Sequence, residues 1–248
     1  MSTLILALTA GAVIGLALGA LGGGGSVLAV PALIYLLGFT PVAATTASLV
    51  IVAVTSATAM SAHARDGNVR WRTGLLFAAA GIGPAMLGGA LAGRIPAAAL
   101  TAAFAVVAGA AALRMLRTRR HADTMVPVRP GRAAAAGAGL GAVTGVLGVG
   151  GGFLAVPALV SVLGMRMRNA VGTSLLVITV NSLAALAARA GTVDGLDWAV
   201  VGPFAGAAIL GAWDGKRLAT KVSGGTLQRI FALVLLAVAA FMLIDAAA

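Results

Sequence analysis

Two glycine-rich runs are the segments of this sequence best suited to bind a ligand. They read GGGGS at 22–26 and GVGGG at 148–152. Each interior glycine costs a helix up to about 1 kcal/mol relative to alanine, so we expect the helix to break at both runs. A broken backbone exposes N–H groups, and these groups together with the positive end of the next helix can bind an anion without a charged side chain.

A proline follows each run at the same distance. Pro31 and Pro157 suit the first turn of a helix, where the missing N–H of proline costs nothing. We therefore expect new helices to begin at these prolines, with residues 27–30 and 153–156 extended. The alternative is that the glycines only allow helices to pack closely, and small-xxx-small spacing predicts this role for six of them: Gly11, Gly15, Gly19, Gly137, Gly141 and Gly145.

Hydroxyl and amide side chains in apolar stretches could complete an anion site. A shift of 126 positions superposes Ser48 on Ser174 and Thr55 on Asn181. The alternative for each is a hydrogen bond to its own helix or to a neighbouring helix. The predicted binding residues are Gly22, Gly23, Gly24, Gly25, Ser26, Pro31, Ser48, Gly148, Gly150, Gly151, Gly152, Pro157, Thr173, Ser174 and Asn181.

The ionisable residues form no recognisable catalytic or metal-binding pattern. The acids are all aspartates, and none lies in the middle of an apolar stretch. We expect His63, beside a basic segment, and His121 to be solvated, and Asp214 to pair locally with Lys216 and Arg217. The sequence therefore predicts no enzyme, no cofactor and no metal site, and it does not favour a proton relay through buried carboxylates.

Composition defines the class of protein. The 248 residues are 60% hydrophobic and only 9% charged, whereas soluble chains carry about 25% charged residues. The net charge of +11 comes from arginines between apolar runs, with 4% aromatic residues. This distribution argues against nucleic-acid binding and favours cytoplasmic loops. We expect an all-α integral membrane protein with about eight to ten hydrophobic segments.

The two halves of the chain are copies of each other. Residues 18–33 match 144–159, and seven glycines of 11–38 coincide with glycines of 137–164, where chance gives about three. The predicted domains are a first membrane repeat, a basic cytoplasmic linker and a second membrane repeat, at 1–116, 117–132 and 133–248. The N-terminal stretch has a counterpart in mid-chain, so we do not expect it to be a cleaved signal peptide.

Charge predicts the relative orientation of the repeats. The linker and segments 63–72 and 214–225 are basic, so we expect them to be cytoplasmic. Segment 189–197, the counterpart of 63–72, carries one arginine and two aspartates and is expected outside. Equivalent loops on opposite sides require an odd number of crossings per repeat, so the repeats are predicted to be inverted.

These motifs resemble the TauE/SafE family of sulfite exporters. The resemblance rests on both glycine-rich stretches ending in VPAL, on GTSL at 172–175 and on GGALAGRIP at 88–96, and it covers nearly the whole chain. The first copy has TASL at 46–49 instead of GTSL, and Ser26 where the second has Gly152, which predicts unequal half-sites. The resemblance implies a bacterial inner-membrane protein that moves sulfite, sulfonates such as sulfoacetate and related anions.

We therefore expect a multi-pass transporter that exports these anions by alternating access. Expelling one negative charge from a negative-inside cell gains about 2.3 kcal/mol per 100 mV, so the membrane potential can drive export. The expected partners are a small anion and the lipid bilayer, without nucleic acid; a homo-oligomer stays open. Two alternatives also stay open: uptake of the same anions, and a non-transporting subunit that docks a cytosolic protein through the linker.

Overall fold

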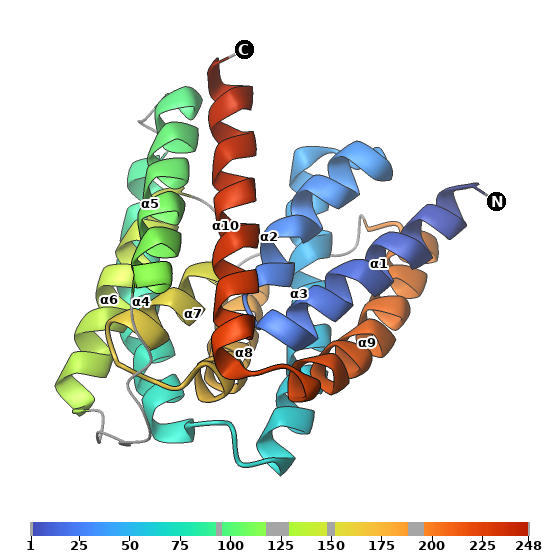
Figure 1. Cartoon of the computed structure of the whole chain (residues 1–248). Helices are drawn as coiled ribbons and strands as arrows, with labels where there is room; N and C mark the ends of the chain where they lie inside the picture. Colours follow the sequence, from blue (N-terminus) through green and yellow to red (C-terminus); the bar gives the residue numbers. More distant parts are fainter. Residues whose placement is uncertain (1, 93–95, 118–128, 148–151, 188–195, 248) are drawn as a thin grey trace.

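The structure is a computed structural model that describes residues 2–92, 96–117, 129–147, 152–187 and 196–247. Within these ranges the chain is helical and contains no strand (Figure 1). The elements are α1 (Ser2–Leu21), α2 (Gly24–Pro31), the π-helix η1 (Ala32–Leu36), α3 (Pro41–Arg65), α4 (Trp71–Ala92), α5 (Ala97–Arg117), α6 (Pro130–Leu147), α7 (Gly152–Ser161), α8 (Met167–Ala187), α9 (Trp198–Lys221) and α10 (Gly224–Ala247).

Four described helices are long and apolar enough to cross a bilayer. They are Thr3–Leu21, Val42–Arg65, Met167–Ala187 and Gly224–Phe241. Large apolar side chains such as those of Val13, Leu210 and Leu233 are exposed on the surface of the chain, as suits contact with lipid. The described residues thus confirm the all-α prediction and agree with a membrane location.

Glycines allow α1 to pack tightly along α9. A Cβ at Gly11 would overlap the Phe204 carbonyl oxygen, and a Cβ at Gly15 would overlap that of Ala208. Contacts that advance together along both helices mean that α1 and α9 run in the same direction. The predicted packing role is confirmed at Gly11 and Gly15, and also at Gly19, which meets the Ala212 backbone.

The same contact recurs between α4 and α6. Gly137 meets the backbone of Phe77, and Gly141 meets the backbone of Gly81, which confirms the packing prediction at these two glycines as well. α1 of the first half therefore packs against α9 of the second half, and α6 of the second half packs against α4 of the first. Each half supplies the partner of the other half's first helix.

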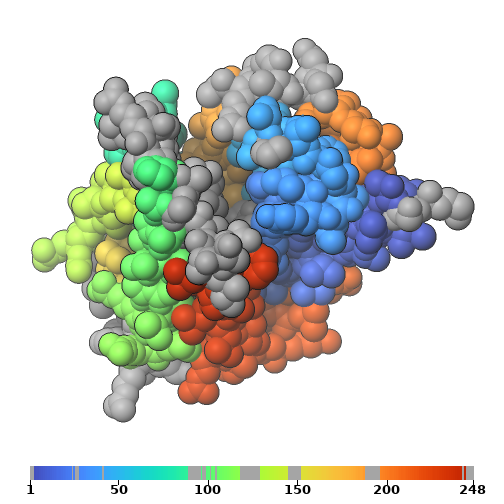
Figure 2. Space-filling view, turned by 90° about the horizontal axis from the view of Figure 1, so that it is seen from above, coloured from blue at the N-terminus to red at the C-terminus, as the bar shows by residue number. Residues whose placement is uncertain are grey.

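The remaining equivalent helices pack against each other in pairs. α3 packs against α8, and α5 packs against α10. Figure 1 shows that α5 and α10 run in opposite directions. In Figure 2, red α10 lies between green α5 and the blue segments of the first half. The core is thus built between the two halves.

The helices after the breaks begin earlier than predicted. α2 begins at Gly24 and α7 at Gly152, so residues 27–30 and 153–156 are helical and not extended. Pro31 and Pro157 lie inside helices instead of starting them. Because Pro31 has no N–H and its ring crowds the preceding turn, the chain widens directly after it into η1.

Segments predicted as loops differ from the structure or lie largely outside the described residues. Segment 214–225 is largely not a loop, because α9 continues to Lys221. α5 ends at Arg117 and α6 begins at Pro130, so most of the predicted linker, including His121, lies outside the described residues. Most of segment 189–197 lies outside them as well.

Candidate functional site

The first break is confined to two residues. The Gly22 N–H donates to the Leu18 carbonyl at 2.8 Å and ends α1, and Gly22 has a φ of +72°. This left-handed conformation is typical of glycine after a helix C-terminus. A Cβ at position 22 would lie 2.5 Å from Ser174 Oγ. The break therefore lies directly against α8 of the other half.

The two breaks meet. A Cβ at Gly23 would overlap the carbonyl oxygen of Gly152 and would lie 2.5 Å from the Cα of Phe153. Gly152 is the first residue of α7, so the N-terminus of α7 lies beside the N-terminus of α2. The other predicted ligands of the second run, Gly148, Gly150 and Gly151, lie outside the described residues.

Close packing explains part of the first run. Gly24, Gly25 and Ser26 lie in the first turn of α2. A Cβ at Gly25 would lie 2.6 Å from both the Ile14 carbonyl oxygen and the Leu18 Cβ, so Gly25 lets α2 pack against α1. Pro31 and Pro157 lie further along their helices, away from the helix starts that meet.

Three predicted hydroxyl ligands make hydrogen bonds within the protein. Ser48 donates to the Thr45 carbonyl at 2.8 Å, and Ser174, which is fully buried, donates to the Val171 carbonyl at 2.8 Å. Thr173 accepts a hydrogen bond from the Arg70 N–H at 3.0 Å. Because Arg70 precedes α4, Thr173 caps the start of that helix. Ser174 is the one of these three that lies against a break.

Two equivalent residues carry buried oxygens without partners. Thr55 Oγ1 and Asn181 Oδ1 have no hydrogen-bond partner among the described residues, and Thr55 is only 2% exposed. Positions seven apart share a helix face, so Asn181 follows Ser174 along α8 at a distance of about 10 Å. The sequence analysis did not include Thr55 among the ligands, although its equivalence to Asn181 was the signal for it.

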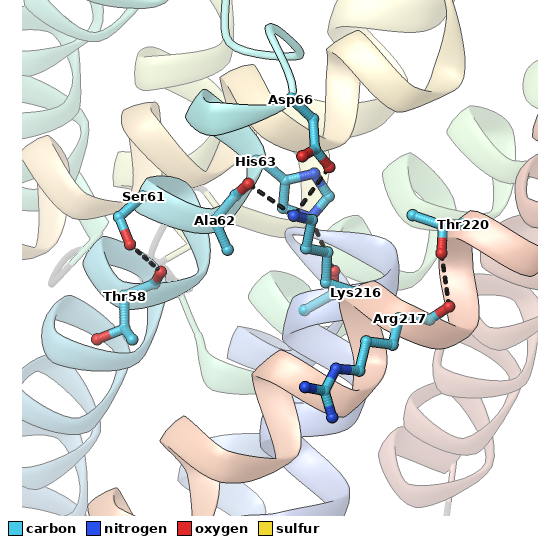
Figure 3. A network of polar contacts seen from close by, with 9 residues as sticks. Thr58, Ser61, Ala62, His63, Asp66, Lys216, Arg217 and Thr220 are labelled. Carbon is cyan, nitrogen blue, oxygen red and sulfur yellow. Dashed lines mark hydrogen bonds and ion pairs between the residues drawn. The ribbon is translucent and has the colours of Figure 1, made fainter.

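The prediction that His63 is solvated is wrong, because its side chain is buried with an exposure of 5%. Its Nε2 lies 3.1 Å from the Gly19 carbonyl oxygen, in the last turn of α1. Lys216 donates to the Ala62 carbonyl at 2.7 Å and pairs with Asp66 at 2.8 Å. Figure 3 shows these groups together at the end of α3. The sequence analysis missed this cluster because its members come from α1, α3 and α9.

The predicted local ion pair forms only in part. Asp214 Oδ1 lies 3.4 Å from Arg217 Nη1 on the surface, as predicted. Lys216 points instead to Asp66, in the connection after α3. Within the described ranges, no group of three or more metal-ligating side chains gathers.

The fold and the paired breaks have the features of a membrane transporter. The described helices include four that are long and apolar enough to cross a membrane, and two helix starts meet between the halves. Helix breaks at matching positions of two halves are typical of transporter binding sites. Comparison with known proteins agrees: the family model described as Sulfite exporter TauE/SafE matches residues 7–242. The chain belongs to this family of membrane transporters.

Two curated relatives from Xylella fastidiosa are each named probable membrane transporter protein. The relative from strain 9a5c is 36% identical, and the alignment covers 97% of this chain and 95% of the relative. The relative from strain Temecula1 is 35% identical, with the same coverage. No solved structure matches this chain.

Proposed function

We propose that this protein exports small sulfur-containing oxyanions, such as sulfite and sulfoacetate, across the bacterial inner membrane. The observation that carries the proposal is the approach of Gly23 to the Gly152 carbonyl, which brings the starts of α2 and α7 together. The positive ends of two helices beside a buried hydroxyl suit a small anion. Neither glycine run contains an acidic residue that would repel it.

In this proposal the transport cycle is alternating access between two inverted repeats, 1–116 and 133–248, joined by the cytoplasmic linker 117–132. The opposite directions of α5 and α10 support the inversion (Figure 1), as does the exchange of partners between the halves. The chain then crosses the membrane several times, with the anion site near the midplane where the halves meet.

The proposed ligands divide into three groups. Peptide groups at the breaks bind the oxyanion, Ser48, Ser174, Asn181 and Thr55 line its path, and Thr173 and the two prolines shape the helices that carry these groups. The peptide groups belong to Gly23, Gly24, Gly25, Ser26, Gly148, Gly150, Gly151 and Gly152, and the prolines are Pro31 and Pro157. The Gly22 N–H already donates to the Leu18 carbonyl, so Gly22 shapes the break and is not proposed as a donor to the anion.

The test is anion flux in proteoliposomes that hold the purified protein alone. We expect protein-dependent flux of sulfite at alkaline pH, where it is a dianion, and a flux that changes with the imposed membrane potential. Replacing Gly24 or Gly150 with a bulky residue should abolish flux and leave membrane insertion intact. Absence of sulfite, sulfoacetate and sulfate flux at every potential would refute the proposal.

A further inference from the structure

His63 combines a fixed hydrogen bond with a ring nitrogen that has no partner. A carbonyl oxygen only accepts, so the contact with Gly19 requires the hydrogen to be on Nε2. Nδ1 is buried and has no hydrogen-bond partner among the described residues. The ring can therefore take a second proton at Nδ1 without losing the bond to Gly19.

The position of the ring links it to the anion site. Gly19 lies three residues before Gly22, in the last turn of α1, whose carbonyls lack partners within the helix. Protonated His63 would place a positive charge beside the break that we propose as an anion site. Proton and anion would then each favour binding of the other, because such coupling is reciprocal.

Two charged groups of opposite sign face the His63 ring, and they pair with each other. α1 contains no titratable side chain. From α9, Lys216 faces the ring, and from the connection after α3, Asp66 does so (Figure 3); the two are paired at 2.8 Å. Asp214 and Arg217 pair with each other on the surface. The carboxylate of Asp66, with its side chain 41% exposed, provides contact with water.

We propose that Nδ1 of His63 binds a proton that travels together with the anion. This inference rests on the proposed anion transport. The proton adds to the lone pair of Nδ1 from the side of Asp66 and returns to water on the opposite side of the cycle. α9 belongs to the second half and α1 and α3 to the first, so a movement between the halves changes the surroundings of the ring.

Only one half carries this arrangement. The positions equivalent to His63 and Lys216 are Arg189 and Gly89, and neither is a histidine or lysine. The proposal is therefore one proton per transport cycle. A monovalent sulfonate that moves with one proton carries no net charge, whereas a sulfite dianion with one proton still does.

The test uses the full chain in proteoliposomes with methanesulfonate, which stays a monovalent anion over the whole pH range. A histidine ring loses its charge as the pH rises, so wild-type flux should fall as the pH rises through the titration of the ring. An internal pH indicator should report proton movement with the anion. An imposed potential should have little effect on this flux.

His63→Gln separates the proton from the hydrogen bond, since the glutamine amide can donate to Gly19 and cannot take a second proton. We expect this variant to exchange methanesulfonate without proton movement, with a flat pH profile and a new dependence on potential. His121→Gln, the matched control at the other histidine, should behave as wild type. A His63→Gln variant with the wild-type pH profile and proton movement would overturn the proposal.

A measurement on wild type alone covers the case in which His63→Gln does not fold. Binding of methanesulfonate to the purified protein in weakly buffered solution should take up protons below neutral pH. Binding or flux without proton uptake overturns the proton site and leaves anion transport standing. Absence of both sulfite and methanesulfonate flux in wild type refutes the proposed function, and this inference with it.

Discussion

Gly23 lies against the carbonyl oxygen of Gly152 so closely that a methyl group at position 23 would overlap this oxygen. The two residues belong to different halves of the chain, and each stands at the start of a short helix. The contact joins backbone to backbone, so no side chain can rotate to relieve an added atom. Any movement of one half against the other must change this contact.

We therefore expect Gly23→Ala to lower anion flux by a factor of about 5 to 150, because overpacking of this kind costs about 1–3 kcal/mol. The measurement is sulfite flux per inserted protein in proteoliposomes. Gly139→Ala is the matched control, since nothing lies within 4 Å of a Cβ at that position. Full flux in the Gly23→Ala variant would show that the contact has no role in transport.

A comparison of two glycines with the same backbone conformation separates the contacts made at Gly22 from backbone strain. Gly22 and Gly38 have φ values of +72° and +70°, so alanine at either position should cost about 1–2 kcal/mol of stability. Only at position 22 would the new Cβ approach Ser174 Oγ, at 2.5 Å. We expect both variants to unfold at lower temperature and only Gly22→Ala to lose flux. Equal flux losses would contradict this assignment.

The contact between α4 and α6 predicts a difference between two glycines of the same helix. Gly141→Ala should destabilise the protein by about 1–3 kcal/mol, because the new Cβ would overlap the Gly81 carbonyl. Gly139→Ala should be neutral or stabilise it by up to about 1 kcal/mol through helix propensity. Thermal unfolding in detergent measures both, and similar values for the two variants would disprove the packing role.

We expect Thr173 to support transport by stabilising the start of α4 and not by contacting the anion. Thr173→Val removes the acceptor for the Arg70 N–H and should cost about 0.5–2 kcal/mol, as the loss of other helix caps does. Thr173→Ser retains the hydroxyl and should restore both stability and the apparent affinity for sulfite. A changed affinity in Thr173→Ser would indicate that the threonine contacts the anion.

Replacing Thr55 should change stability and flux in opposite directions. Thr55→Val removes a buried oxygen without a partner, so stability should rise by about 1 kcal/mol while flux falls. Thr179→Val is the matched control, because it breaks the 2.9 Å hydrogen bond to Ser56 and should lower stability. Unchanged flux in Thr55→Val would remove this residue from the proposed path.

The features predictable from sequence were those with a periodic signal. The spacing of Gly11, Gly15 and Gly19, repeated 126 positions later, predicted close helix packing, although it did not reveal that each helix packs against the opposite half. The duplication placed one break in each half, and the structure brings Gly23 and Gly152 together. Repetition therefore predicted where contacts occur better than which helices make them.

Local propensity failed where contacts between distant segments decide the structure. The glycines of α2 are helical although glycine disfavours helices, because Gly25 packs against Leu18 of α1. Charge pattern assigned Lys216 to its neighbour Asp214, whereas its actual partner Asp66 belongs to the other half. The burial of His63 likewise depends on α1, and a hydropathy pattern contains no such information.

The exchange of helices between the halves also limits how this chain can be assembled. α1 makes its most extensive contacts with α9, so α1 lacks its main partner until α9 has followed it into the bilayer. The main partner of α1 belongs to the second half, and the main partner of α6 belongs to the first. A chain of half this length would need a second copy of itself to cover α1, so the contact between the halves has the character of a subunit interface inside a single polypeptide.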